Sequence, residues 1–133
     1  MLTTRCGMVP CREWRLNSTP RGMRMNEDDV RWPLRGPCLC RALTLEVDAL
    51  AGPLLISHCR ECHKSAGAAF IAVMPLLIGD FRVRDTLAAL TSYRVTLHKA
   101  RYFCACCGCP VYSARDGADS VRVRACGCIA AAA

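Results

Sequence analysis

Closely spaced cysteines are the residues of this chain whose types and spacing best suit chemistry. The sequence holds 12 cysteines in 133 residues. A tight turn can aim two nearby sulfurs at one ion, and zinc prefers four ligands in a tetrahedron with Zn–S distances of roughly 2.3 Å. The spacing therefore favours metal chelation by pairs of cysteines, which are Cys38 with Cys40, Cys59 with Cys62, Cys104 with Cys107, and Cys126 with Cys128.

The segment FCACCGCP at residues 103–110 places four thiols in one short stretch of chain. Gly108 follows Cys107, and glycine permits the tight turn that a zinc knuckle needs. Cys104 and Cys107 are therefore the expected chelating pair of this segment. Cys106 and Cys109 are left as candidate bystanders. The pair Cys126 and Cys128 has no assigned partner pair unless Cys6 and Cys11 complete a third zinc site with it.

A disulfide scaffold is the rival explanation of so many cysteines, and it requires a secreted protein. The N-terminal stretch is broken by Arg5, Pro10 and Arg12, so it lacks the apolar run of a signal peptide. The longest apolar run, residues 66–79, is too short to span a bilayer. We therefore expect a cytoplasmic protein with no membrane partner, in which clustered thiols act as metal ligands or catalytic groups.

The formal net charge of +7 raises the possibility of a nucleic-acid partner. Most of the basic residues are arginines, and they are spread along the chain among acidic residues. The few aromatic residues do not interleave with them as a base-stacking surface requires. A solvated, arginine-rich surface is therefore the preferred interpretation, and a nucleic-acid partner is disfavoured.

The elements that must position the thiols are predicted to be strands. Leu43, Leu45 and Val47 alternate with polar residues, which is the period-two pattern of a half-buried strand. The sequence also predicts buried strands at 53–59 and 68–76 and further strands at 81–85, 90–96 and 120–125. Residues 59–67 are expected to hold at most one helical turn, and Phe70, Tyr93 and Phe103 are assigned to core packing. A mainly β fold follows.

The ordered motifs GPCLCRALTLEV, SHCRECHKSAGAAF, LTSYR and RYFCACCGCPVY resemble the glutathione-dependent formaldehyde-activating family, which shares its domain with the centromere protein V-like proteins. The resemblance covers about residues 34–113 and implies a zinc-bound β-tent of small curved antiparallel sheets around zinc knuckles. Residues 34–128 are then the zinc-binding domain, between an irregular, arginine-rich extension at 1–33 and an alanine-rich tail at 129–133.

The resemblance implies two zinc ions, one structural and a second that is held more weakly. The structural site would consist of Cys38, Cys40, Cys104 and Cys107, and Arg41 stands where the family usually has glycine. The second, reactive site would be formed by the catalytic residues Cys59 and Cys62. Its third thiol position is occupied here by Ser57, and a hydroxyl is a weaker zinc ligand than a thiolate. Water, a substrate thiolate, His58 or His63 could fill the gap.

The function implied by the resemblance is that of a zinc-dependent carbon–sulfur lyase. Zinc at Cys59 and Cys62 would lower the pKa of a small thiol such as glutathione, whose thiolate attacks formaldehyde. Arg60 and Lys64 lie next to this motif and could attract the carboxylates of glutathione, although exposed basic residues are common beside metal motifs. The alternative is a non-catalytic, zinc-stabilised binding module of the centromere protein V-like type, which the missing third thiol favours.

Overall fold

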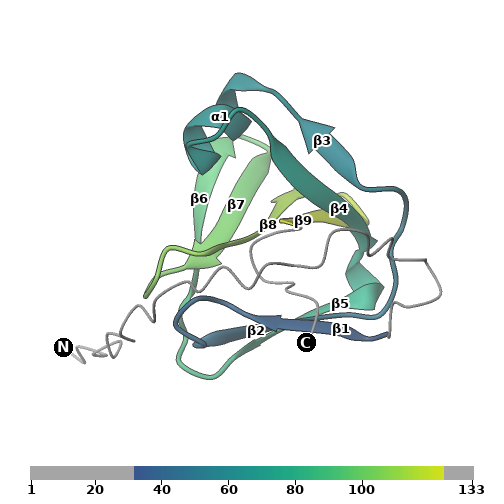
Figure 1. Cartoon of the computed structure of the whole chain (residues 1–133), viewed down its shortest axis with the longest axis vertical. Helices are drawn as coiled ribbons and strands as arrows, with labels where there is room; N and C mark the ends of the chain where they lie inside the picture. The colour runs from purple at the N-terminus through teal and green to yellow at the C-terminus, as the bar shows by residue number, and fades with distance from the viewer. Residues whose placement is uncertain (1–31, 125–133) are drawn as a thin grey trace, which may run out of the picture.

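A computed structural model describes residues 32–124 of the chain, which form two antiparallel sheets, one α-helix and a short 3-10 helix (Figure 1). The predicted N-terminal extension up to residue 31, the alanine-rich tail, and Cys6, Cys11, Cys126 and Cys128 lie outside the described residues. Within the described part of the chain, the prediction of a mainly β fold with small antiparallel sheets is confirmed.

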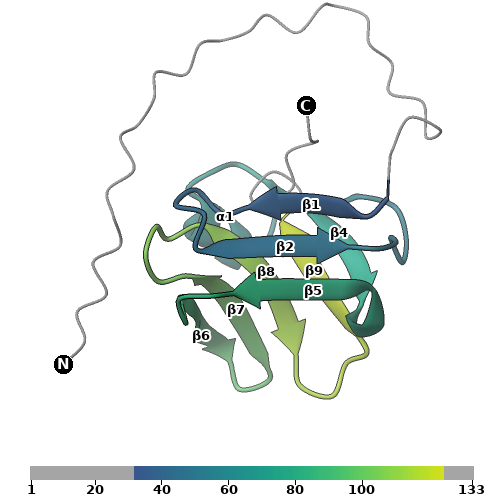
Figure 2. The same ribbon diagram turned by 90° about the horizontal axis from the view of Figure 1, so that it is seen from below.

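The smaller sheet has three strands in the order β1–β2–β5 (Figure 2). These strands are β1 (Leu34–Pro37), β2 (Leu43–Val47) and β5 (Phe81–Asp85). Strand β2 is central, and its residue Leu45 pairs with Gly36 on one side and Val83 on the other. The period-two pattern that predicts β2 arises from burial, because Leu43, Leu45 and Val47 are all buried.

The larger sheet has six strands in the order β3–β4–β9–β8–β7–β6. Its strands are β3 (Leu55–Ser57), β4 (Ile71–Leu77), β9 (Ser120–Arg124), β8 (Pro110–Arg115), β7 (Lys99–Cys104) and β6 (Leu90–Thr96). A 3-10 helix, η2 (Ile78–Asp80), connects β4 of this sheet to β5 of the smaller one.

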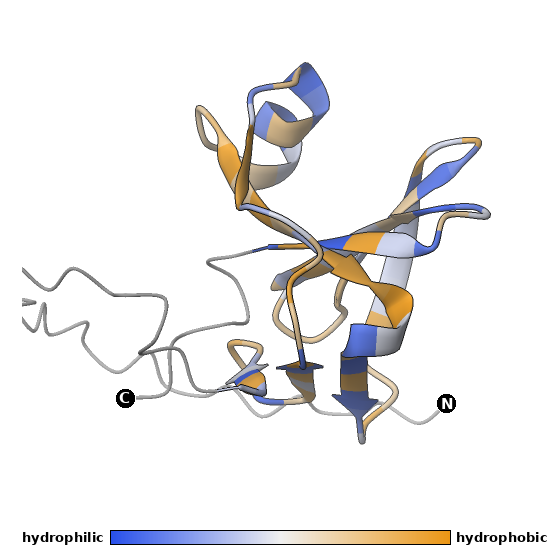
Figure 3. Cartoon of the chain, turned by 90° about the vertical axis from the view of Figure 1, so that its right-hand side faces the viewer, coloured by the Kyte–Doolittle hydropathy of each residue, from blue (hydrophilic) through white to orange (hydrophobic). Residues whose placement is uncertain are grey.

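The main core lies between the two sheets, which face each other in Figures 1 and 2. It combines side chains from β2 with side chains of the six-stranded sheet, which are Met74, Leu76, Val111, Val121 and Val123. Figure 3 shows the continuous apolar stretch of β4 in orange. Because side chains alternate across a strand, one face of the six-stranded sheet contributes to this core and the other face points away from it.

The α-helix, α1 (Arg60–Ala66), is longer than the single turn that the sequence predicts. Its seven residues make about two turns. Both ends are capped: Cys59 Sγ accepts a hydrogen bond from the backbone N–H of Cys62, and Gly67 ends the helix in the left-handed conformation with φ of 62°. Within residues 32–124, no helix has the length and apolar content needed to cross a membrane.

The predicted buried strand at 53–59 is wrong in its burial and in its length. Only Leu55–Ser57 pair as strand β3, and Leu54, Leu55 and Ile56 are exposed. The cause is the position of β3 at the edge of the sheet, where it pairs with β4 alone. An apolar run cannot by itself distinguish a central strand from an edge strand.

Candidate metal centre and arginine-lined pocket

Four cysteine sulfurs from two distant segments meet in one cluster. Cys38 and Cys40 lie in the turn between β1 and β2, Cys104 ends β7, and Cys107 lies in the turn before β8. Their four sulfur atoms lie within 4.8 Å of one another. Cys40 Sγ lies 3.6 Å from both Cys38 Sγ and Cys104 Sγ. The cluster therefore connects the three-stranded sheet to the six-stranded sheet.

The turn that carries Cys38 and Cys40 is held by its own backbone. The N–H of Cys38 donates to the carbonyl oxygen of Leu43 at 2.9 Å, and the N–H of Leu43 donates to Cys38 Sγ at 3.3 Å. The N–H of Arg41 donates to the carbonyl oxygen of Cys38 at 3.0 Å. Arg41 has φ of 65°, in the left-handed region that glycine adopts without strain.

The second turn has the geometry that the sequence predicts for Gly108. The N–H of Gly108 donates to the carbonyl oxygen of Cys104 at 2.8 Å, and the N–H of Cys104 donates to the carbonyl oxygen of Cys109 at 3.0 Å. Gly108 has φ of 73°, and this left-handed residue closes the turn directly after Cys107. The prediction of a tight turn at this glycine is confirmed.

The four clustered thiols fit a tetrahedral metal site in both spacing and electrostatics. Zn–S distances of roughly 2.3 Å place two thiolates of a tetrahedron about 3.8 Å apart, close to the two separations of 3.6 Å. Burial raises the pKa of the Cys104 thiol to about 12, and burial also raises the pKa of Cys38. A cation at the centre of the cluster would oppose these shifts by stabilising the thiolates. The cluster can therefore hold a metal ion.

A second pair of thiols lies at the start of α1, away from the four-sulfur cluster. Cys59 Sγ lies 2.8 Å from Cys62 Sγ, and Ser57 Oγ lies 3.1 Å from Cys62 Sγ. Cys62 packs with Ile71 and Val73 in a small apolar cluster of its own. The end of β3 and the first turn of α1 thus bring together Ser57, Cys59 and Cys62, which we call the middle motif.

The environment of Cys62 favours its thiolate. Burial raises the pKa of Cys62, but the hydrogen bonds from Cys59, Ser57 and Arg101 outweigh this effect and lower the pKa to about 7. The guanidinium group of Arg101 contributes through its positive charge as well. A substantial fraction of Cys62 is therefore nucleophilic near neutral pH.

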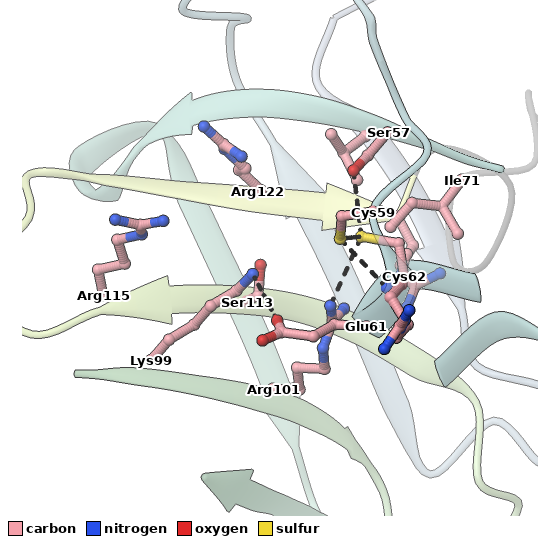
Figure 4. A pocket seen from close by; sticks show the side chains of 13 residues that line it. Ser57, Cys59, Glu61, Cys62, Ile71, Lys99, Arg101, Ser113, Arg115 and Arg122 are labelled. Atoms are coloured by element: carbon pink, nitrogen blue, oxygen red, sulfur yellow. Dashed lines mark hydrogen bonds and ion pairs between the residues drawn. The ribbon is translucent and has the colours of Figure 1, made fainter. Parts of the chain in front are cut away.

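This thiol pair opens into a pocket of about 500 Å³ on the face of the six-stranded sheet that points away from the core (Figure 4). The lining comes from β3, β4, α1, β7, β8 and β9. Its charged side chains are six basic ones and one acidic one, which are Arg60, Lys99, Arg101, Arg115, Arg122, Arg124 and Glu61. The pocket therefore presents its two thiols to a strongly cationic surface.

Strand register explains how these basic side chains come to share one face. Arg101 of β7 pairs with Ser113 of β8, which in turn pairs with Arg122 of β9. One step of alternation along β7 and β8, Lys99 pairs with Arg115. Residues directly opposite each other on antiparallel strands project to the same face of the sheet. The row of cations thus runs across three strands beside the thiol pair.

Comparisons with known proteins identify the family of the chain. The family model described as glutathione-dependent formaldehyde-activating enzyme matches residues 33–133. The chain belongs to this family. A crystal structure of a protein from Rhodobacter sphaeroides matches the fold with a TM-score of 0.60 and 23% identity, covering 75% of this chain and 90% of that chain. A comparison with the curated proteins gives no match.

The six cysteines that the family resemblance singles out lie in two groups in the structure. Cys38, Cys40, Cys104 and Cys107 form the four-sulfur cluster, whereas Cys59 and Cys62 lie together at the pocket. Within the described part of the chain, no histidine or carboxylate completes a set of three metal ligands with Cys59 and Cys62. His58 instead lies beside Phe70, with 6.1 Å between the ring centroids.

Two further predictions concern basic residues beside the pocket and aromatic residues assigned to the core. Arg60 lines the pocket as considered, whereas Lys64 is not part of its lining. The assignment of Phe70 and Tyr93 to the core is wrong, because they are 53% and 67% exposed. Phe70 directly precedes β4, and Tyr93 lies on the edge strand β6, where a side chain has a neighbouring strand on one side only.

Proposed function

We propose that this member of the family binds zinc and acts as a carbon–sulfur lyase on the adduct of a thiol with formaldehyde. S-Hydroxymethylglutathione is the first candidate substrate, in keeping with the description of the family model. The observation that carries the proposal is the position of Cys59 and Cys62 at a pocket lined by six basic side chains. A reducing cytoplasm, where thiols persist, is the compartment in which we place this chemistry.

Zinc is the metal that best suits the four-sulfur cluster of Cys38, Cys40, Cys104 and Cys107. Four thiolates in a closed tetrahedron are typical of structural zinc sites, and such sites contribute directly to folding. The cluster joins a turn of the smaller sheet to a turn of the larger one. We therefore assign the structural ion to this cluster.

We assign the second, more weakly held zinc ion to Cys59 and Cys62. Bound there with an open coordination position, zinc would act as a Lewis acid that lowers the pKa of the substrate sulfur. The fit is less complete than at the four-sulfur cluster, because the two sulfurs lie 2.8 Å apart and must separate by about 1 Å to hold one ion. Ser57 Oγ, 3.1 Å from Cys62 Sγ, is the nearest further ligand group.

The residues around the thiols suit cleavage of the adduct. In the lyase direction, the substrate hydroxyl loses its proton to water, its oxygen forms the formaldehyde C=O, and the C–S bond breaks to leave a thiolate. Arg101, whose Nη2 lies 3.7 Å from Cys62 Sγ, places a positive charge where sulfur becomes anionic. The other basic side chains attract the anionic groups of the thiol and thereby orient it.

The alternative function is that of a non-catalytic zinc-stabilised binding module. Ser57 at the third position of the middle motif favours it, because a hydroxyl binds zinc more weakly than a thiolate. The two functions make the same prediction for the four-sulfur cluster and different predictions for the pocket. A binding module keeps the structural ion and has no effect on the exchange between formaldehyde and its thiol adduct.

A metal analysis combined with an exchange assay tests the proposal. We expect the purified full-length protein to contain between one and two zinc ions, one of which resists mild chelation. We also expect it to accelerate exchange of 13C-formaldehyde between the free and glutathione-bound forms, as followed by NMR. Cys59→Ser should abolish the acceleration, whereas the matched control Cys109→Ser should retain it. A zinc-replete wild type with no acceleration would exclude S-hydroxymethylglutathione as the substrate, and no acceleration with any small thiol would exclude the lyase.

A further inference from the structure

The pocket has two chemically different ends. Cys59 and Cys62 lie at one end, next to α1, and Arg115 and Arg122 lie toward the other end in Figure 4. Strand spacing of about 4.8 Å and a two-residue rise of about 6.6 Å separate the Cα atoms of Arg101 and Arg115 by about 8 Å. Because Arg101 Nη2 contacts Cys62 Sγ at 3.7 Å, a ligand with its sulfur at the thiols has to extend along the sheet to approach Arg115.

The positive charge of the pocket is poorly neutralised by the protein itself. Six basic side chains face a single acidic one, Glu61, which lies 3.8 Å from Lys99 Nζ. Burial lowers the pKa of Arg124, and the positive charge of Arg101 lowers it further, so these two guanidinium groups repel each other. Within residues 32–124, the buried Nε of Arg101 has no hydrogen-bond partner. An anionic ligand would relieve this repulsion.

Glutathione is a weaker electrostatic match to this surface than a thiol that carries a phosphate group. At neutral pH it has two carboxylates and one ammonium group, so its net charge as a thiol is about −1. Its ammonium group would add a further positive charge to a pocket that already has an excess of cations. A phosphate monoester adds about −1.5 to −2 in one compact group with three acceptor oxygens. Arginine binds such a group with two parallel hydrogen bonds.

We propose that the pocket takes a thiol that carries a phosphate group at its far end, with the sulfur at Cys59 and Cys62 and the phosphate at Arg115 and Arg122. The proposal names the substrate class of the lyase and rests on that proposed function for the position of the sulfur. The position of the phosphate does not depend on the lyase function, because the sheet register alone places Arg115 and Arg122 near each other. Arg122 of β9 is opposite Ser113 of β8, and Ser113 lies two residues before Arg115 on the same strand.

Two ligands that differ by one phosphate group test the proposal directly. The probes are 4′-phosphopantetheine and pantetheine, titrated calorimetrically into the zinc-replete full-length protein, with glutathione as the dicarboxylate comparison. We expect phosphopantetheine to bind at least tenfold more tightly than pantetheine, since charge-assisted hydrogen bonds to phosphate are strong. Its affinity should also fall steeply as salt is raised. Equal affinity for the two probes would overturn the proposal.

Arginine variants locate the phosphate. Arg115→Gln and Arg122→Gln should each weaken phosphopantetheine binding about tenfold and change pantetheine binding less than twofold. Arg84→Gln is the matched control, because Arg84 is exposed on β5, in the other sheet, and its loss removes the same charge. If Arg84→Gln weakens phosphopantetheine binding as much as the pocket variants do, only general charge attraction is present and the assigned site is wrong.

The outcomes separate this proposal from the proposed lyase function. If wild type accelerates formaldehyde exchange with glutathione but binds the two probes equally, the lyase function holds and the phosphate site does not. If phosphopantetheine binds through Arg115 and Arg122 but no thiol reacts, the phosphate site holds and the lyase function does not. Glutathione binding as tight as that of phosphopantetheine would show that carboxylates suffice, which also contradicts the preference for phosphate.

Discussion

Arg101 and Cys62 are in contact across the pocket, although 39 positions separate them in the sequence. Arg101 Nη2 lies 3.7 Å from Cys62 Sγ and connects strand β7 to helix α1. The same arginine pairs in register with Ser113, so its place is fixed by the sheet rather than by the helix. The reactivity of the thiol thus depends on a residue that no local motif includes.

Replacing Arg101 tests its effect on the thiol. Arg101→Met removes a hydrogen bond and a positive charge, both of which lower the pKa of Cys62, so this pKa should rise from about 7 toward its usual value of 9.0. The fraction of thiolate at pH 7 and the rate of alkylation of Cys62 by iodoacetamide should then fall several-fold. The pH dependence of that rate, measured after mild chelation, reports the pKa. Arg101→Lys keeps the charge and should show a smaller shift; an unchanged pH profile in Arg101→Met would contradict the assignment.

Much of the fold follows from local patterns, and the exceptions have physical causes. The alternation of Leu43, Leu45 and Val47 predicts β2 because one face of this strand is buried in the core. The sequence does not predict β7 and β8, since an arginine and a tyrosine in each strand obscure the period-two pattern. The predicted burial of β3 is wrong, because a local pattern does not show whether a strand lies at the centre or at the edge of its sheet.

The pocket was less predictable than the thiol motifs. The alternation in β9 shows that Arg122 and Arg124 share one face and Val121 and Val123 the other. It does not show that Arg101 of another strand joins them, because that depends on the register of β7, β8 and β9. A motif reports residues close in sequence, whereas this cationic row is assembled across strands.

Arg41 offers a test of backbone strain beside the metal cluster. Its φ of 65° is left-handed, and an L-residue in that region costs roughly 1–2 kcal/mol. Arg41→Gly should therefore raise the free energy of unfolding by about 1 kcal/mol, as measured by urea denaturation of the zinc-bound protein. Arg41→Ala also removes the charge but keeps the Cβ atom, so it should give no such gain. Equal stabilisation by both variants would attribute the effect to charge.

Ser57 tests the alignment of the middle motif. Ser57 Oγ lies 3.1 Å from Cys62 Sγ, so Ser57→Cys would place a third sulfur beside the existing pair. Because thiolates bind zinc more strongly than hydroxyls do, this variant should raise zinc occupancy of the weaker site toward one and increase any formaldehyde exchange. Metal analysis after mild chelation measures the occupancy. Ser92→Cys on β6 is the control for an added thiol, and equal zinc uptake by both variants would count against this alignment.

The roles of the two thiol groups can be separated by stability. Cys38 and Cys104 belong to the cluster that connects the two sheets, so Cys38→Ser and Cys104→Ser should both unfold the domain. Structural zinc contributes on the order of 10 kcal/mol, comparable with the whole stability of a domain. Cys59→Ser should instead leave a folded protein without its labile zinc. Cys59 lies between β3 and α1, beside the six-stranded sheet only, and so does not hold the two sheets together. Thermal unfolding and zinc content of the three variants, with Cys109→Ser as control, decide between the roles. A folded Cys38→Ser beside an unfolded Cys59→Ser would reverse the assignment.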